Sequence, residues 1–212
     1  MEILKKNWFD KHKRWNGFFA KILRFENDNE LALQYIKNEF NILDFGCGDC
    51  TTFDIIRRKY QEAHLTGFEI DKRAVNIAKN KGYNVYTSLK DINHIENKFD
   101  CILMLQVIEH LKKHQIYEFF DFTKKHLKKD GIIIVSSVNT REFFSLRDFW
   151  DNIDHKYPIS LKAINQLCQI YNYKQLKIIK KCPRLNPFKI LINIMLGDDI
   201  YTGWFVVLKK EK

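Results

Sequence analysis

Short apolar runs alternate with segments of helical spacing along most of this 212-residue chain. Continuous apolar runs are typical of strands that are buried on both faces of a sheet. They predict strands over 41–45, 64–70, 84–87, 99–108, 131–138, 175–181 and 204–208. The segments between them predict helices over 51–60, 72–81, 111–127 and 161–172. This alternation indicates an α/β fold with a doubly wound, mostly parallel, seven-stranded sheet.

The two ends of the chain depart from this pattern. Residues 1–40 carry apolar residues at helical spacing without a strand, so we treat 1–40 as an N-terminal helical cap and 41–212 as the sheet domain. No long helical pattern separates the last two strands, which predicts an antiparallel strand at that edge. The apolar insert 183–203 fits packing on the sheet edge, a homodimer seam or contact with a greasy acceptor.

Composition narrows the class of protein. The net charge is +10, but lysines are scattered in pairs without a base-reading motif, so a nucleic-acid partner is not favoured. The N-terminus lacks the apolar region of a signal peptide, and no apolar run approaches the ~20 residues of a transmembrane helix. Five cysteines, with a single C-x-x-C at Cys47 and Cys50, suit reduced thiols and a cytoplasmic protein. A peripheral membrane contact stays open.

The stretch NILDFGCGDC at 41–50 forms the first predicted strand-to-helix turn. Ligands of doubly wound sheets lie beyond the carboxyl ends of the strands. Gly46 and Gly48 would let a ligand touch the main chain. Asp44 would repel a phosphate but attract a cation or accept hydrogen bonds. The third glycine position of a dinucleotide-binding turn holds Cys50 or Thr51 instead, which argues against a pyrophosphate.

A second carboxylate, Glu69, ends the second predicted strand 21 positions after Gly48. At that distance it is placed to accept hydrogen bonds from both hydroxyls of a ribose. The ligand should therefore carry a ribose, a base and a cationic part, without phosphate. S-adenosylmethionine fits this description.

These motifs resemble those of class I S-adenosylmethionine-dependent methyltransferases, in the small-molecule and glycan-associated, ubiquinone-methyltransferase-like branch. LDFGCGDC, GFEIDKRAVNIAKNKG, FDCILMLQVIEHL and LKKDGIIIVSSVN carry the resemblance, over residues 41 to about 139. It implies a Rossmann-like methyltransferase fold with S-adenosyl-L-methionine as the cofactor. The residues expected to bind it are Asp44, Gly46, Cys47, Gly48, Glu69, Ile70, Ser88, Leu89, Leu105 and Gln106.

Glu109 and His110 follow the fourth predicted strand. Some relatives, including ubiquinone-type O-methyltransferases and small-RNA methyltransferases, have an E-x-x-E-H sequence here that binds a divalent ion. This chain has Gln106 at the first acidic position, and an amide is a poorer ligand for a hard cation. We therefore expect no metal. Alternatively, Glu109 and His110 form the first turn of a helix and bind nothing, since a Glu is stabilising near a helix N-terminus.

The stretch DFWDNIDHKYPIS at 148–160 breaks the helical and strand patterns and ends before Ser160, a typical N-cap. It resembles a D-x-x-H stretch of methyltransferases associated with surface glycans. A hydroxyl acceptor must lose a proton as the methyl group moves, and a histidine suits that step. We predict His155 as the base, oriented by Asp154 or Asp151, with His110 as the rival.

The sequence thus predicts an enzyme that methylates an oxygen of a small polar acceptor, such as a sugar, a nucleotide-sugar or a surface-glycan precursor. One alternative is an RNA methyltransferase, which the positive charge favours and the absence of an RNA-binding module disfavours. The other is a nucleoside-binding protein without catalysis. The full set of Asp44, Gly46, Gly48 and Glu69 argues against that alternative.

Overall fold

The computed structural model describes residues 27–92, 98–181, 187–197 and 199–211. Residues 1–26 of the expected N-terminal cap and the fifth cysteine, Cys182, lie outside these ranges. In the rest of the expected cap, Asp28–Ala32 is helical. Within the described ranges no helix is both long and apolar enough to cross a bilayer.

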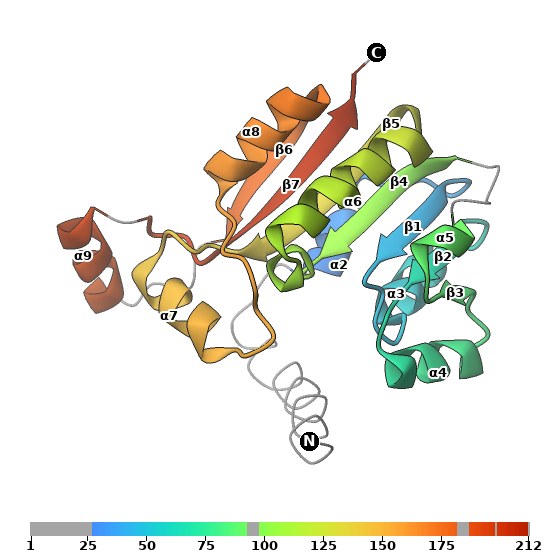
Figure 1. The fold of residues 1–212 in the computed structure, drawn as a ribbon, viewed down its shortest axis with the longest axis horizontal. Helices are drawn as coiled ribbons and strands as arrows, with labels where there is room; N and C mark the ends of the chain where they lie inside the picture. Colours follow the sequence, from blue (N-terminus) through green and yellow to red (C-terminus); the bar gives the residue numbers. More distant parts are fainter. Residues whose placement is uncertain (1–26, 93–97, 182–186, 198, 212) are drawn as a thin grey trace.

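A seven-stranded sheet organises the chain, in the order β3-β2-β1-β4-β5-β7-β6 (Figure 1). Its strands are β1 (Asn41–Phe45), β2 (His64–Phe68), β3 (Val85–Tyr86), β4 (Phe99–Leu105), β5 (Leu127–Val138), β6 (Tyr173–Lys181) and β7 (Gly203–Lys210). The pairs from β3 to β5 are parallel, whereas β7 runs antiparallel to both β5 and β6. The predicted mostly parallel sheet with an antiparallel strand in its edge region is therefore confirmed; β7 lies one place in from the edge.

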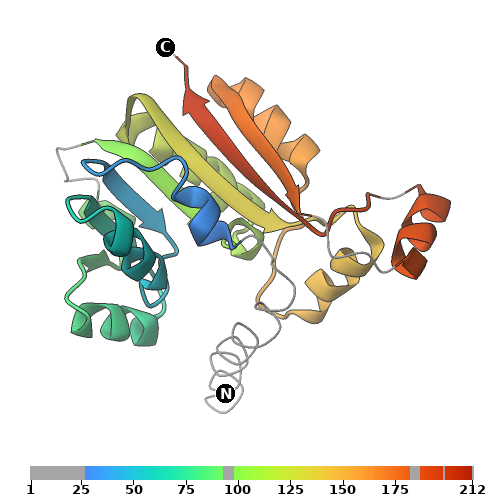
Figure 2. The same cartoon turned by 180° about the vertical axis from the view of Figure 1, so that it is seen from behind.

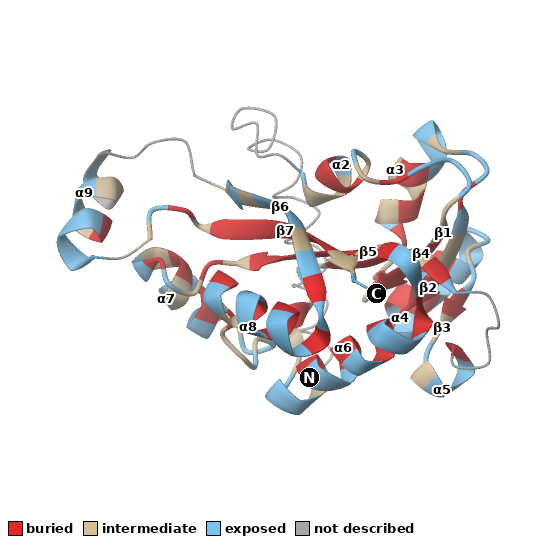
Figure 3. Ribbon diagram, turned by 90° about the horizontal axis from the view of Figure 1, so that it is seen from above, coloured by how far each residue is buried: buried red, intermediate tan, exposed pale blue. Residues whose placement is uncertain are grey.

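Helices cover both faces of the sheet. They are α2 (Asp28–Ala32), α3 (Thr51–Lys59), α4 (Lys72–Asn80), α5 (Leu89–Ile92), α6 (Lys113–His126), α7 (Phe143–Asp151), α8 (Leu161–Tyr171) and α9 (Pro187–Leu196), with a 3₁₀ turn η1 (Ile108–His110). Helices α6 and α8 lie on the face in front in Figure 1, and α2 and α3 on the face in front in Figure 2. Seen from above, the strands form a middle layer between the helices that is mostly buried, except for the largely exposed edge strand β6 (Figure 3).

The side chains of β4 show how the two cores are built. Successive residues of a strand point to opposite faces. Ile102 and Met104 join the core beneath α6 and α8, while Cys101 and Leu103 join the core beneath α2 and α3. Burial on both faces explains why this strand reads as one continuous apolar run.

Three of the expected boundaries are wrong. Strand β4 ends at Leu105, because η1 follows. Residues 128–131 are not a turn that ends a helix: β5 begins directly at Leu127, which pairs with Phe99. The first four residues of the predicted loop 148–160 belong to α7. In contrast, the expected N-cap at Ser160 is confirmed, since its side chain accepts from the Ala163 N–H.

The predicted apolar insert contains a helix, α9, whose polarity is inverted. Among its residues whose burial is described, the buried one is Asn193, which donates a 2.7 Å hydrogen bond from Nδ2 to the Glu142 carboxylate, also buried. Its exposed residues are large and apolar: Phe188, Leu191, Ile194, Met195 and Leu196. The helix lies at the far end of the molecule from β3, beside α7 (Figure 1). The three roles considered for this insert stay open.

Candidate functional site

The order of the strands has its switch point at the centre of the sheet, which is where sheets of this kind form a ligand crevice. The chain runs outward from β1 to β2 and β3, then returns to the other side of β1 to form β4. The connections that leave β1 and β4 therefore diverge, and ligands of such sheets bind at this switch point. The residues predicted to bind a cofactor all lie in or just after β1, β2, β3 and β4, so the fold brings them to one edge.

The turns after β1 and β2 are joined by main-chain and carboxylate hydrogen bonds. The N–H groups of Gly46 and Cys47 donate to the Phe68 carbonyl, at 2.8 and 3.1 Å. Glu69 Oε2 accepts from the Gly48 N–H at 3.0 Å, and its Oε1 accepts from the N–H groups of Ile70 and Asp71 at 2.7 and 2.8 Å. The Glu69 carboxylate is thus held at the crevice by three backbone donors.

The two glycines of the first turn have different roles. Both have positive φ, +84° at Gly46 and +56° at Gly48. A Cβ on Gly46 would lie 2.5 Å from Val107 Cγ2, whereas a Cβ on Gly48 would meet nothing within 4 Å. Gly46 therefore allows Val107, in the connection that follows β4, to pack against the turn after β1. Gly48 leaves room beside Glu69 for a ligand. Cys50, at the third position of the motif, adopts φ +61° without being glycine.

Two buried groups beneath this turn, Asp44 and Cys47, have raised pKa values. Asp44 is 2 % exposed, and burial raises its pKa to about 7; a hydrogen bond from Thr52 offsets part of this shift and the charge of Glu69 adds to it. A hydrogen bond with Cys50, followed by burial, raises the pKa of the Cys47 thiol far above its usual range. Both cysteines are free thiols. Because a thiolate is the reactive form, this C-x-x-C is chemically quiet.

The other predicted cofactor residues line the same edge. Ile70 is an apolar side chain that is 73 % exposed just after β2. Ser88 Oγ accepts from the Lys90 N–H at 3.2 Å, and Leu89 begins α5. Leu105 is half-buried at the end of β4. An exposed apolar side chain beside Glu69 is suited to the flat face of a base.

Gln106 belongs to a polar network that the sequence did not reveal. It has φ +55°, and its Nε2 donates to Asp28 Oδ2 at 2.9 Å and to Ser136 Oγ at 3.3 Å. Asp28 also accepts from Ser136 Oγ at 2.8 Å and forms an ion pair with Lys181. Asp28 and Lys181 come from opposite ends of the sequence, and no local pattern connects them.

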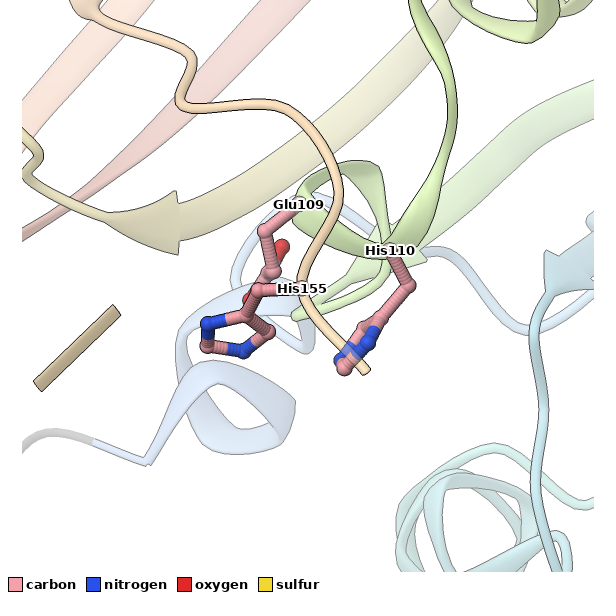
Figure 4. A group of neighbouring side chains, drawn as sticks. All are labelled: Glu109, His110 and His155. Atoms are coloured by element: carbon pink, nitrogen blue, oxygen red, sulfur yellow. The ribbon is translucent and has the colours of Figure 1, made fainter. Parts of the chain in front are cut away.

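A second group of polar side chains gathers where η1 follows β4. The ligand-type atoms of Glu109, His110 and His155 all lie within 4.8 Å of one another (Figure 4). The two imidazole rings are 4.8 Å apart between centroids and inclined at 63°. The Glu109 carbonyl accepts from the N–H groups of Lys156 and Tyr157, at 2.9 and 3.4 Å. These main-chain bonds dock the 152–160 segment, and with it His155, against η1.

The environment of these side chains sets their protonation. Burial raises the pKa of Glu109 to about 7, partly offset by its backbone N–H and by the Ser137 hydroxyl, which donates to Oε2 at 3.0 Å. Burial also lowers the pKa of His155, and nearby His110 lowers it further.

Both histidine rings are held through Nδ1 by main-chain carbonyls. His110 Nδ1 lies 3.1 Å from the Asp154 carbonyl, and His155 Nδ1 lies 3.0 Å from the Phe149 carbonyl. A carbonyl can only accept, so each Nδ1 carries the proton. The Asn152 amide lies 3.1 Å from His155 Nε2. Asp154, predicted to orient His155, contacts the rival ring through its carbonyl and acts on His155 through its charge. Asp151 is exposed at the end of α7.

Comparison with known proteins gives a consistent result. A family model described as "Methyltransferase domain" matches residues 11–178. The chain is 21 % identical over 185 residues to a malonyl-[acyl-carrier protein] O-methyltransferase of Priestia megaterium, covering 79 % of this chain and 67 % of that protein. It is 34 % identical over 113 residues to N-methyltransferase 4 of Papaver somniferum, covering 46 % of this chain and 30 % of that protein. The chain thus spans under a third of that plant relative.

Solved structures share the fold at low identity. A SAM-dependent methyltransferase from Archaeoglobus fulgidus aligns with a TM-score of 0.69 and 18 % identity, over 91 % of this chain and 98 % of that chain. Magnesium protoporphyrin IX methyltransferase from Synechocystis PCC 6803, solved with bound SAH, aligns with a TM-score of 0.65 and 13 % identity, over 97 % and 94 %.

The different surroundings of the two glycines can be tested by stability. Alanine at either position adopts a left-handed backbone at a cost of about 1–2 kcal/mol. Only Gly46→Ala adds a clash, with Val107, so we expect it to lower the free energy of unfolding by about 1–3 kcal/mol more than Gly48→Ala. Urea denaturation of both variants measures the difference. Adding Val107→Ala should rescue Gly46→Ala; equal losses without rescue would contradict the assigned role of Gly46.

Burial of Asp44 should make stability depend on pH. Its pKa in the folded chain is about 7, above the ordinary value of 3.8. Between these two pH values the folded chain keeps a proton on Asp44 that the unfolded chain has released. The free energy of unfolding therefore falls as pH rises through this range. Asn at position 44 does not titrate, so Asp44→Asn does not lose stability in this way. The free energy of unfolding of Asp44→Asn minus that of the unmodified chain should therefore rise by up to about 3 kcal/mol between pH 5 and pH 8. Urea denaturation at both pH values is the measurement; a pH-independent difference would rule out the raised pKa.

Proposed function

Because this chain belongs to the methyltransferase domain family and is an S-adenosylmethionine-dependent methyltransferase, we propose that it methylates an oxygen atom of a small polar acceptor. The acceptor class we favour is a sugar, a nucleotide-sugar or a surface-glycan precursor. A cytoplasmic location is part of the proposal and agrees with four buried, free thiols among the described residues.

The residues of the crevice fit the cofactor. The Glu69 carboxylate would accept from the ribose hydroxyls, and the open space at Gly48 leaves room beside it. The exposed side chain of Ile70 would pack on the adenine, with Ser88 and Leu89 bordering it. Leu105 and Gln106 would line the sulfonium end, and Asp44 would attract the cationic amino group through its charge. When bound, S-adenosylmethionine supplies a methyl group activated by its sulfonium.

One observation supports oxygen as the methylated atom: groups that can accept a proton converge at the end of β4. Glu109 and His110 lie on η1, which follows β4, and a ligand-type atom of His155 lies within 4.8 Å of theirs. A neutral hydroxyl is a weak nucleophile until its proton is removed, so an oxygen acceptor needs such a group. We assign this role to His155, with His110 as the rival. The rest of the chain holds the reactants in line, an effect worth about 7–11 kcal/mol in well-oriented reactions.

A second candidate is methylation of an amine, which the likeness to plant N-methyltransferases favours. A screen by mass spectrometry for gain of a methyl mass separates the two. Its panel should contain nucleotide-sugars, glycan phosphates, quinol precursors, amines and short RNAs. Turnover of a hydroxyl acceptor with no turnover of amines supports the proposal; methylation of amines or RNA alone would overturn it.

Glu69 should be required for cofactor affinity. Removing its carboxylate deletes a charge-assisted hydrogen bond to the ribose, worth about 1.5–3 kcal/mol, and also frees the Gly48 N–H. We expect Glu69→Ala to raise the Kd for S-adenosylmethionine by roughly ten- to a hundredfold. Isothermal titration calorimetry measures this value. Asp71→Ala is a matched control, because that carboxylate caps α4 and pairs with Arg73. Unchanged affinity in folded Glu69→Ala would refute the assignment.

His155 should act on turnover and not on cofactor binding. We expect His155→Ala to lower kcat by ~10²-fold or more, with the Kd for S-adenosylmethionine near its original value. His114→Ala, an exposed histidine at the start of α6, should keep full activity. If His155→Ala turns over normally and His110→Ala does not, the base is His110.

A further inference from the structure

The cluster of Glu109, His110 and His155 is assembled from two distant segments. Glu109 and His110 lie on η1, whereas His155 is delivered by the segment that follows α7. From the geometry of these three side chains we propose that they bind one divalent transition-metal ion of the class of Zn²⁺, Mn²⁺ or Co²⁺. The sequence argued against a metal because Gln106 replaces a carboxylate. The fold supplies His155, a ligand which that reasoning lacked.

The histidine rings are oriented as metal ligands require. Metal-binding histidines commonly donate their other N–H to a carbonyl or carboxylate, which fixes the ring and its tautomer. Here both Nδ1 atoms lie on main-chain carbonyls, of Asp154 and Phe149. Nε2 is therefore the atom that each ring can offer to an ion. The Asn152 amide on His155 Nε2 would have to turn away.

The carboxylate is positioned in the same manner. Glu109 is 2 % exposed, and Ser137 Oγ holds its Oε2. Its own carbonyl accepts from the N–H groups of Lys156 and Tyr157, so the backbone that carries Glu109 is tied to the backbone that follows His155. Ligand atoms about 2.1 Å from a tetrahedral ion lie roughly 3.4 Å apart. One nitrogen of each imidazole and one carboxylate oxygen of Glu109 all lie within 4.8 Å of one another, so modest rotations of these side chains would bring three ligand atoms to that spacing.

The ligand set selects the class of ion. Mg²⁺ and Ca²⁺ prefer all-oxygen ligands, whereas two imidazoles and one carboxylate suit transition ions. Gln106 does not complete an oxygen-rich site, because its amide is committed to Asp28 and Ser136. Three protein ligands leave further coordination positions for a water molecule or an acceptor. A divalent ion beside a hydroxyl lowers the pKa of that hydroxyl, so with the ion bound the metal replaces His155 as the group that activates the acceptor. The role of the ion in activating a hydroxyl acceptor rests on the proposed function, whereas the binding of the ion does not.

Metal binding can be measured without any acceptor. The purified full chain is stripped with a chelator, dialysed against Zn²⁺, Mn²⁺, Co²⁺ or Mg²⁺, and analysed for bound metal by mass spectrometry. We expect one transition ion per chain and at least a hundredfold weaker binding of Mg²⁺. With Co²⁺, visible absorption bands should report nitrogen ligands. His155→Ala and His110→Ala should each weaken binding at least tenfold, while Gln106→Ala and His114→Ala should not change it.

The alternatives give distinct results. Sub-stoichiometric binding to the full chain, a preference for Mg²⁺, or binding unaltered in His155→Ala would each overturn the site. Because buried Glu109 supports the fold, Glu109→Gln is read only together with the two histidine variants, whose circular dichroism should match that of the unmodified chain. A chain that binds the ion but methylates only amines would refute the proposed acceptor and leave the metal site standing. A chain that methylates hydroxyls but has no affinity for these ions would refute the metal site and leave the proposed acceptor standing.

Discussion

The adjacency of β1 and β4 at the centre of the sheet determines where every functional group of this chain lies. Parallel strands all present their carboxyl ends at one edge, and the change of direction between β3 and β4 opens that edge at a single place. The β1 and β2 turns supply the Glu69 carboxylate and the space at Gly48 on one side of the opening. The β4 turn supplies Glu109 and His110 on the other. Gly46 allows this approach, since its missing side chain makes room for Val107.

Glu109 connects the chemistry to the fold through its main chain and its side chain. Its carbonyl accepts hydrogen bonds from the N–H groups of Lys156 and Tyr157, so the segment carrying His155 is tied to η1 through the peptide backbone. These bonds do not depend on the side chains of residues 152–160. Its carboxylate faces the two imidazoles from a buried position. A buried carboxylate without a full-strength partner is costly to fold around. Such a group is most readily retained where ligand binding or catalysis offsets this cost in folding free energy.

Periodicity predicted most of the sheet, because strands buried on both faces leave continuous apolar runs, as in β4 and β5. It failed where long-range pairing overrides local preference, as at 127–131, where the pairing of Leu127 with Phe99 extends β5 through residues typical of a turn. The motif residues after β1 and β2 were also readable, because their spacing is local. Asp28 and Lys181 were not, since only the folded sheet brings the two ends of the chain to Gln106 and Ser136. The burial pattern of α9 was not readable either, because the polar Asn193 is buried while large apolar residues of the helix are exposed.

The hydrogen bond between Glu69 Oε2 and the Gly48 N–H also bears on how this sequence can diverge. One carboxylate serves as a structural brace for the first motif and as the proposed ribose acceptor of the second, so neither motif can drift alone. A shorter Asp at 69 would retain the charge but retract from Gly48. A different turn after β1 would leave Glu69 with one oxygen unsatisfied. Homologous chains should therefore change these two turns together, as a single inherited unit.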